Sequence, residues 1–376
     1  MHLKTLTLKG FRNIHSQTLV FNPEFNFIFG KNAQGKTNLI EAIYYLAELK
    51  SFRTTNRQDL IEKNEDFAHI QGLFEKDSMS WDLSVLLTEN ERRILLNQKK
   101  PKNRNQYYGL IPLILFEPRH IYLFRDRPSQ RRQYLNRALY IQHVQNITLF
   151  REYDKVVAQK NRLLKEGRNL DSLEVWNAQL ASLGGQIIYK RLEWLQGVGK
   201  YLASEYRAIS NTTEEFVLKY KSSLDIVNDV DGALLTQEVI EEGLRAKLAA
   251  VYSEEMVRRE AIIGPHRDDF LACIGSRHLG HYGSQGENRS AVIALKLSQL
   301  KMFTAKHDKA PLFLLDDVAS ELDEERCRYL FSYLKSESTQ VFLTTTDSTL
   351  HLANFAGHAT SFFVEKGAVS AATQQL

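Results

Sequence analysis

One octapeptide near the start of the chain constrains its fold more than any other feature. Residues Gly30 to Thr37 read G-K-N-A-Q-G-K-T and satisfy the pattern G-x-x-x-x-G-K-[ST]. The apolar run Phe25–Phe29 precedes them, and a helical pattern follows from Asn38 through Leu46. A strand, a glycine-rich turn and a helix N-terminus in this order direct backbone N–H groups at a phosphate. The segment therefore predicts a nucleotide-binding α/β unit.

The same pattern assigns roles within the loop. We expect the Lys36 ammonium to meet the β- and γ-phosphates of ATP and the Thr37 hydroxyl to ligate Mg²⁺. The predicted nucleotide-binding residues of the loop are Gly30, Lys31, Asn32, Ala33, Gln34, Gly35, Lys36 and Thr37.

The acidic partner of such a loop is expected at the end of a buried strand. Leu312–Leu315 are four consecutive large apolar residues, and Asp316 and Asp317 follow them directly. We expect Asp316 to hold the water shell of Mg²⁺. We expect Asp317 to orient or deprotonate the attacking water, so the predicted catalytic residues are Asp317 and Lys36. The other interpretation is an exposed turn that follows a core strand.

The spacing of these motifs predicts an insertion. The chain has 376 residues, or roughly 2.5 units at about 150 residues per domain. Short β-branched and aromatic runs alternate with helical patterns in residues 1–123 and 262–376, which predicts an α/β domain built from both ends of the chain, with the nucleotide motif in its first part. Residues 124–261 carry apolar side chains at helical spacing and predict an inserted, mostly helical lobe. The expected strand runs are Leu3–Leu8, Phe25–Phe29, Leu83–Leu87, Leu312–Leu315 and Val341–Thr345.

A short hairpin of long helices is expected in that lobe. Its turn is predicted at Gly167–Leu170, with Asp171 capping the second helix and Glu174 reaching back to it. A third helix is expected from Thr236 to Arg259.

Composition excludes several classes of protein. With 43% hydrophobic and 25% charged residues, the chain matches an ordinary globular protein. No run approaches the roughly 18 apolar residues of a membrane span, and no apolar signal segment opens the chain. Cys273 and Cys327 have neither a disulfide framework nor zinc spacing. We therefore expect a cytoplasmic protein without a membrane partner.

A second anion site is predicted before the acidic strand. Residues 282–289 read Y-G-S-Q-G-E-N-R and open an apolar helix. A serine and a glycine at a helix start can bind an anion, but one nucleotide needs only one loop. This segment either contacts the γ-phosphate of ATP held by a neighbouring copy or is a plain N-capped helix.

The order of these motifs resembles the ATPase heads of the ABC/SMC superfamily, and within it the RecF family of bacterial recombinational repair. The resemblance spans the chain, from an opening strand at residues 8–13 and a loop at 51–54 to a turn at 263–269, the segment 282–286 and the run from Asp316 to Asp323. It implies an ABC-type P-loop fold and a homodimer whose two heads sandwich two ATP molecules. The implied dimer clamps duplex or gapped DNA, hydrolyses ATP slowly with stimulation by DNA, and works with RecO and RecR to load RecA.

The resemblance also implies site residues beyond the glycine-rich loop. Arg12, Asn13 and Asn38 would join the nucleotide site. Ser284, Gln285, Gly286 and Glu287 would form the signature that reaches across the dimer, where Ser320 and Asp323 would also lie. In a cell, such a protein would be associated with the nucleoid.

The chain departs from the family pattern at three places. Arg119 and His120 follow Pro118 where the family usually has two acids, which puts the metal-sensing role of this loop in question. Asp317 is one methylene shorter than the catalytic glutamate of many ABC ATPases, so we expect slow turnover. Residues 344–347 read T-T-T-D where those enzymes have a switch histidine.

A basic segment is the expected DNA surface. The net charge of +4 hides twelve Lys and Arg residues between Arg92 and Arg137, against only Glu117 and Asp126. Such grouping suits sequence-independent phosphate binding, although a solvated basic loop would have the same composition. The DNA-binding candidates are Arg92, Arg93, Lys99, Lys100, Lys102, Arg104, Arg131 and Arg132.

Two other function classes compete with the repair ATPase. An ABC ATPase subunit coupled to a membrane or other protein partner would carry an L-S-G-G-Q signature and a switch histidine, and neither is present. An SMC-like scaffold would use ATP only to fasten its dimer.

Overall fold

The computed structural model describes residues 1–76, 79–102, 106–167, 172–228, 235–318, 322–346 and 358–371, and it forms two compact units. Met1–His120 and Phe303–Leu376 make the first unit, and Ile121–Met302 make the second. Within the described residues, no helix has the length and apolar character that crossing a membrane requires.

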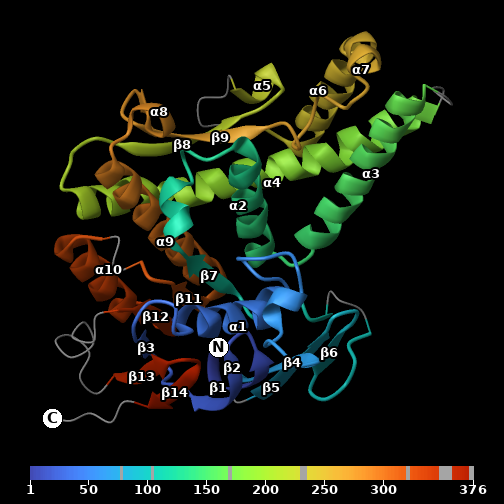
Figure 1. Ribbon diagram of the computed structural model, residues 1–376. Coiled ribbons are helices and arrows are strands. Elements are labelled where there is room, and N and C mark those ends of the chain that lie inside the picture. Colours follow the sequence, from blue (N-terminus) through green and yellow to red (C-terminus); the bar gives the residue numbers. More distant parts are fainter. Residues whose placement is uncertain are drawn as a thin grey trace. The chain divides into compact units, whose positions relative to one another are not determined.

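A six-stranded sheet in the first unit carries the glycine-rich loop (Figure 1). Its strands are parallel except for the edge strand β14. The central strands are almost continuously apolar and buried, as expected for a parallel sheet covered on both faces. In spatial order the strands are β14 (Ala368–Ala371), β13 (Ala359–Glu365), β3 (Phe25–Phe29), β12 (Val341–Thr345), β11 (Leu312–Leu315) and β7 (Leu113–Phe116).

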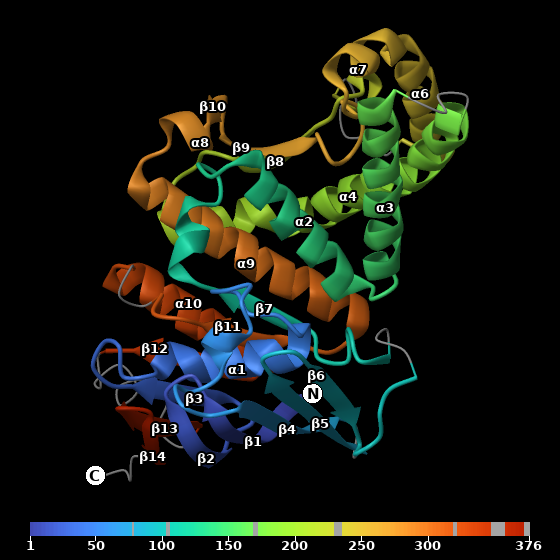
Figure 2. The same ribbon diagram turned by 45° about the vertical axis from the view of Figure 1, so that its right-hand side comes forward.

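An antiparallel five-stranded sheet completes the core of this unit. Helix α1 (Lys36–Glu48) contacts β12 and β7 of the first sheet and β1, β4 and β5 of the second, so it is buried almost all round (Figure 2). Helix α10 (Glu324–Ser336) follows β11 along the chain. The predicted α/β fold and all five predicted strand runs are confirmed. The second sheet has the order β2 (Ile14–Val20), β1 (His2–Phe11), β4 (Phe67–Lys76), β5 (Met79–Thr88) and β6 (Arg92–Leu96).

The second unit is mostly helical. Helices α3 (Asn146–Glu166) and α4 (Leu173–Ser210) form the predicted hairpin (Figure 1). Leu149, Tyr153 and Leu180 of these helices belong to one buried apolar cluster. Gly167 ends α3 in the left-handed conformation, with φ of 63°. The predicted cap Asp171 lies outside the described residues. Other helices of this unit are α2 (Pro128–Gln142), α5 (Asp225–Asn228), α6 (Gln237–Ala250), α7 (Tyr252–Arg258) and α8 (Leu279–Tyr282).

The prediction of a single helix from Thr236 to Arg259 is wrong, because the helix is interrupted between α6 and α7. Val251 has φ of −94° and ψ of 6°, outside the helical range. Thr236 caps α6 by accepting a hydrogen bond from Val239 N at 3.4 Å. Neither glycine nor proline marks the break, so the helical pattern runs through it.

The predicted domain boundary near residue 262 also differs from the observed division. Strand β9 (Asp269–Ile274) pairs with β8 (Phe216–Lys221) on one side and β10 (Arg277–His278) on the other, which places residues 262–302 in the second unit. Most of α9 (Gln285–His307) belongs there too, and Tyr134 of α2 donates to Gln299 Oε1 at 3.0 Å. Sheet pairing and helix packing together hold this segment in the insertion.

Candidate nucleotide site

The glycine-rich loop follows β3 and depends on its two glycines. Gly30 has φ of 154° and Gly35 has φ of 120°, both in the region that disfavours side chains. A Cβ on Gly30 would lie 2.3 Å from Val364 O, and one on Gly35 would lie 2.8 Å from Asn13 Oδ1. The loop therefore takes this path only with glycine at both positions.

Polar contacts hold the loop from two sides. Gln34 O accepts hydrogen bonds from Asn13 Nδ2 and Gly367 N, both at 2.9 Å. Gln34 Oε1 accepts from Lys366 N at 2.7 Å, and Asn38 Nδ2 donates to Asn13 Oδ1 at 2.7 Å. Asn13 and Asn38, which the resemblance predicts at the nucleotide site, thus hold the loop in place. The side chains of Lys31 and Asn32 in the loop are exposed.

Lys36 lies buried at the start of α1 and points back into the loop. Its Nζ donates to Gly30 O at 2.6 Å and to Lys31 O at 3.0 Å. Burial lowers the pKa of Lys36, and the nearby carboxylates of Asp317 and Asp316 oppose that shift. A desolvated ammonium framed by loop carbonyls is a strong partner for an incoming phosphate.

Thr37, Asp316 and Thr344 meet at the carboxyl edge of the six-stranded sheet. Thr37 Oγ1 donates to Asp316 Oδ1 at 2.9 Å, and Thr344 Oγ1 donates to the same oxygen at 2.8 Å. Burial raises the pKa of Asp316, while these two hydrogen bonds oppose the increase. A hydroxyl and a carboxylate oxygen held side by side fit Mg²⁺, which prefers hard oxygen ligands.

Asp317 stands next to this pair in a constrained backbone conformation. It has φ of 50°, uncommon for a residue other than glycine, and its N–H donates to Thr344 Oγ1 at 2.7 Å. Strained backbone of this kind gathers at functional sites. The sequence therefore placed both carboxylates correctly at the strand end beside Lys36, and their chemical roles stay predictions.

A carboxylate inside α1 organises residues that the sequence analysis did not connect. Glu41 is fully buried and accepts hydrogen bonds from Arg12 Nε at 2.9 Å, Arg12 Nη2 at 2.7 Å and Arg53 Nη1 at 3.2 Å. Arg53 Nη1 also donates to Asn38 Oδ1 at 2.7 Å, and its charge acts on Asp316. Arg12, a predicted nucleotide-binding residue, thus braces α1, and Arg53 contacts Asn38 next to the glycine-rich loop. The available signal was Glu41 itself, the one charge in the apolar run 39–47.

The loop after β7 begins beside Asp316, because Phe116 pairs in register with Leu315. Arg119 and His120, the residues that replace the two acids of the family pattern, both lie close to Glu117. Glu117 N donates to His120 Nδ1 at 3.1 Å, and Arg119 Nε lies 3.8 Å from Glu117 Oε2. Glu117 is therefore the acid that this chain offers at that strand end.

In the second unit, the predicted signature opens α9 with a reciprocal cap. Ser284 Oγ accepts from Glu287 N at 3.1 Å, and Glu287 Oε2 accepts from Ser284 N at 2.6 Å. Ser284 and Gln285 are exposed, and Gly286 is half-buried. This geometry matches the N-capped helix, and it leaves the helix start accessible to a ligand.

The two further interface residues have separate outcomes. Ser320 lies outside the described residues. Asp323 is the N-cap of α10, accepts from Arg326 N at 3.0 Å and pairs with the Arg326 guanidinium. Asp323 therefore stabilises the start of α10, independently of any contact that it makes across a dimer.

The basic candidates fall into two groups. Arg93, Lys99, Lys100 and Lys102 are exposed on β6 and the chain after it, Arg92 is half-buried with its guanidinium bonded to Leu49 O, and Arg104 lies outside the described residues.

Arg131 is buried, which contradicts its predicted role in DNA binding. Its guanidinium forms a bidentate pair with Asp269, at 2.8 Å to Oδ1 and 2.5 Å to Oδ2. Arg132 donates to Asp268 O at 3.0 Å, and burial lowers its pKa. Since Arg131 is committed to folding the insertion, the exposed group after β6 is the stronger DNA candidate.

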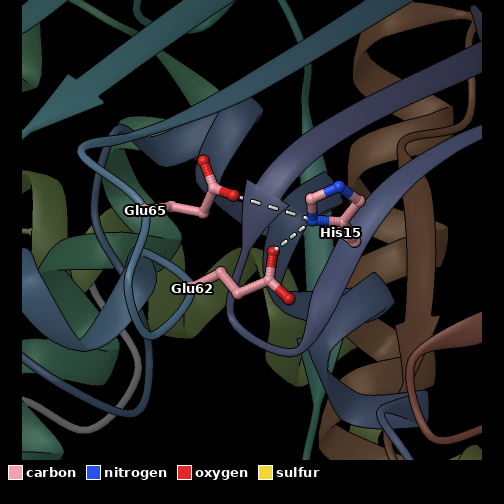
Figure 3. A group of neighbouring side chains, drawn as sticks. All are labelled: His15, Glu62 and Glu65. Carbon is pink, nitrogen blue, oxygen red and sulfur yellow. Dashed lines mark hydrogen bonds and ion pairs between the residues drawn. The ribbon is translucent and has the colours of Figure 1, made fainter.

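A separate cluster has the composition of a metal site but not its surroundings. His15 Nδ1 lies 3.0 Å from Glu62 Oε2 and 3.8 Å from Glu65 Oε1 (Figure 3). The His15 side chain is 74% exposed, so these are ordinary surface contacts whose polar groups water can also satisfy. We assign it no function.

Comparison with known proteins places these motifs in a family. The model described as "RecF/RecN/SMC N terminal domain" matches residues 2–368. A DNA replication and repair protein RecF from Geobacter metallireducens is 35% identical over 371 residues, which cover 98% of this chain and 100% of that protein. A protein of the same description from Bacillus cereus is 35% identical over 92% of both chains.

Solved structures agree with the sequence matches. Two structures of the recombination mediator protein RecF in the RecFOR pathway, one described as RecF-ATP and one as RecF-ATPrS, each match with a TM-score of 0.88 and 30% identity. The RecF-ATP match covers 99% of both chains, and the other covers 99% of this chain and 98% of its counterpart. An Smc head bound to the C-winged helix domain of ScpA matches with a TM-score of 0.59 at 14% identity, which supports the fold alone.

Proposed function

The chain belongs to the RecF/RecN/SMC N-terminal domain family, and on that premise we propose that it is an ATP-dependent DNA-binding protein of recombinational repair and replication. The observation that carries the proposal is the contact of Thr37 with Asp316 beside the buried ammonium of Lys36. The relatives are named as DNA replication and repair proteins, and one similar structure is described as RecF-ATP.

The first unit binds ATP with Mg²⁺. Backbone N–H groups of the glycine-rich loop and the Lys36 ammonium receive the phosphates. Thr37 Oγ1 and Asp316 would hold Mg²⁺, which neutralises charge on the β- and γ-phosphates. The buried strands behind Asp316 keep these groups in fixed positions.

Asp317 accepts a proton from the attacking water. We expect Asp317→Asn to lower ATP turnover by about a hundredfold or more, since a general base contributes about 10²–10⁴. ATP affinity should change little, because Asp317 does not hold the phosphates. A phosphate-release assay with a separate binding titration measures both, with Glu324→Gln, an exposed acid on α10, as the control. Unchanged turnover would show that Asp317 is not the catalytic carboxylate.

With ATP bound, two copies associate and enclose duplex or gapped DNA. Ser284, Gln285, Gly286 and Glu287 approach the nucleotide of the partner copy, with Ser320 and Asp323 nearby. Hydrolysis is slow and stimulated by DNA, and the dimer acts with RecO and RecR to help load RecA in the cytoplasm, at the nucleoid. The RecFOR pathway named for the similar structures supports these partners.

Light scattering tests the dimer. The solution mass is measured with and without ATP and a short gapped duplex at near-physiological salt. A monomer that doubles its mass only with ATP, and retains DNA in that state, is the expected result. A monomer that ignores ATP would contradict the clamp.

The exposed basic residues after β6 bind DNA phosphates. Reversing Lys99, Lys100 and Lys102 to Glu should flatten the slope of log affinity against log salt by roughly 0.9 for each phosphate that the protein no longer neutralises. The control reverses three scattered, exposed lysines of the same unit, Lys63, Lys306 and Lys335, for an equal change in net charge. Equal slopes for the two triple variants would place the DNA surface elsewhere.

Two alternatives remain distinguishable by the same measurements. An SMC-like scaffold would dimerise with ATP in light scattering but release no phosphate in the turnover assay. An ABC subunit coupled to a different protein partner would bind ATP and show no DNA-dependent mass change. The names of the relatives support the repair role over both.

A further inference from the structure

The turn that precedes α9 is held by polar contacts in addition to the reciprocal cap of Ser284 and Glu287. Gly283 O accepts a hydrogen bond from the Arg125 guanidinium. Ser284 O accepts from Asn288 Nδ2 at 2.8 Å, and Asn288 is itself buried. Together with the reciprocal cap of Ser284 and Glu287, these contacts fix the turn before the first residue of the helix.

The cap also determines which hydrogen bonds the Ser284 hydroxyl can still form. Its oxygen accepts from Glu287 N, so the hydroxyl hydrogen remains available to an acceptor outside the turn. The same cap, however, places the negative Glu287 carboxylate at the helix start. An unneutralised carboxylate there would repel a triphosphate brought by a second copy.

Arg277 on β10 resolves this conflict. Its Nη2 lies 2.9 Å from Glu287 Oε1, the oxygen that does not accept from Ser284 N. The same nitrogen lies 2.9 Å from Glu214 Oε2, just before β8. Arg277 is therefore anchored within the three-stranded sheet while its positive charge offsets that of the capping carboxylate.

We infer that Arg277 is a positioning residue that holds Glu287, and through it the Ser284 hydroxyl, ready for the nucleotide of the partner copy. This inference rests on the proposed dimer. Arg277 itself does not touch the nucleotide, and it acts by orienting the cap and offsetting its charge. Since charge-assisted hydrogen bonds are directional, a shorter or neutral side chain cannot do both.

The partial exposure of the Arg277–Glu287 pair argues against a large contribution to folding stability. The Arg277 and Glu287 side chains are 43% and 25% exposed, and pairs of this kind contribute little to folding. Arg245 and Glu241 on α6 form an ion pair of similar exposure, 50% and 23%, at 2.6 Å. Arg245→Ala is therefore a matched control for the loss of one arginine and one half-exposed ion pair in the same unit.

The experiment compares Arg277→Ala, Arg277→Lys, Ser284→Ala and Arg245→Ala. Two quantities are measured for each full-length variant: the affinity of the monomer for a fluorescent ATP analogue, and the ATP concentration at which half the protein is dimeric by light scattering. We expect Arg277→Ala to keep its monomer affinity and melting temperature but to need about fivefold more ATP to dimerise. Arg277→Lys should recover part of the loss, because lysine restores the charge without the guanidinium geometry.

The outcomes separate the inference from the proposal beneath it. Impaired dimerisation in Ser284→Ala with wild-type behaviour in Arg277→Ala would overturn the role of Arg277 and leave the dimer standing. Wild-type dimerisation in both variants would overturn the cross-copy role of Ser284 itself. An equal loss in Arg245→Ala would also overturn the inference, because it would reduce the effect to a general change in charge.

Discussion

Lys36→Met is expected to remove tight ATP binding while leaving the protein folded. The buried ammonium of Lys36 is held by Gly30 O and Lys31 O, at the place where the loop would receive phosphate. Removing one partner of a buried, hydrogen-bonded charge pair costs about 2–5 kcal/mol or more, so the dissociation constant for ATP should rise by at least about thirtyfold. Equilibrium titration with a fluorescent ATP analogue measures the change.

Stability distinguishes the loss of this phosphate ligand from a damaged fold. Burial already lowers the pKa of Lys36, so its charge is held at a cost in the free protein. Methionine has a similar volume but no donor for Gly30 O and Lys31 O, so the free energy of unfolding should fall by about 1–3 kcal/mol, a loss that leaves the protein folded. Lys63→Met, at an exposed position, is the control for both measurements. Wild-type ATP affinity in Lys36→Met would show that the phosphate site lies elsewhere.

Short sequence patterns predicted the strands and the loop of this fold, because each depends on neighbouring residues in the chain. Phe25–Phe29 and Leu312–Leu315 are continuous apolar runs beside polar ends, and both are central parallel strands. Their carboxyl ends carry the glycine-rich loop and Asp316, so two motifs almost 280 residues apart could be placed together from the chain order alone. The helix break at Val251 was missed, because no glycine or proline interrupts the apolar spacing there.

Long-range ion pairs were beyond the reach of the sequence. Arg131 reads as part of a basic run, but its partner Asp269 lies 138 residues away and removes it from the surface. Arg12 and Glu41 are likewise joined only by the fold. In both cases the sequence shows a charge, while its burial depends on which strand or helix packs against it.

Breaking one buried ion pair is expected to destabilise the insertion strongly. Lys160 of α3 and Glu255 of α7 are each 1% exposed, and Lys160 Nζ lies 2.6 Å from Glu255 Oε2. Glu255 Oε1 also accepts from Ile262 N at 3.0 Å. Burial lowers the pKa of Lys160, and the hydrogen bond and charge of Glu255 oppose that shift. Each charge is thus tolerated inside the unit only because the other is present.

Lys160→Met should therefore reduce the free energy of unfolding by about 3–5 kcal/mol, because it leaves the Glu255 carboxylate buried without its cation. Adding Glu255→Gln should restore much of that loss, since the amide oxygen still accepts from Ile262 N and carries no charge. The control is Arg162→Met, which breaks the exposed Arg162–Glu166 pair on the same helix and should cost less than about 1 kcal/mol. Urea denaturation of the four proteins, followed by circular dichroism, measures these differences. Equal losses in Lys160→Met and Arg162→Met would mean that the buried pair opens to water and does not hold α3 against α7.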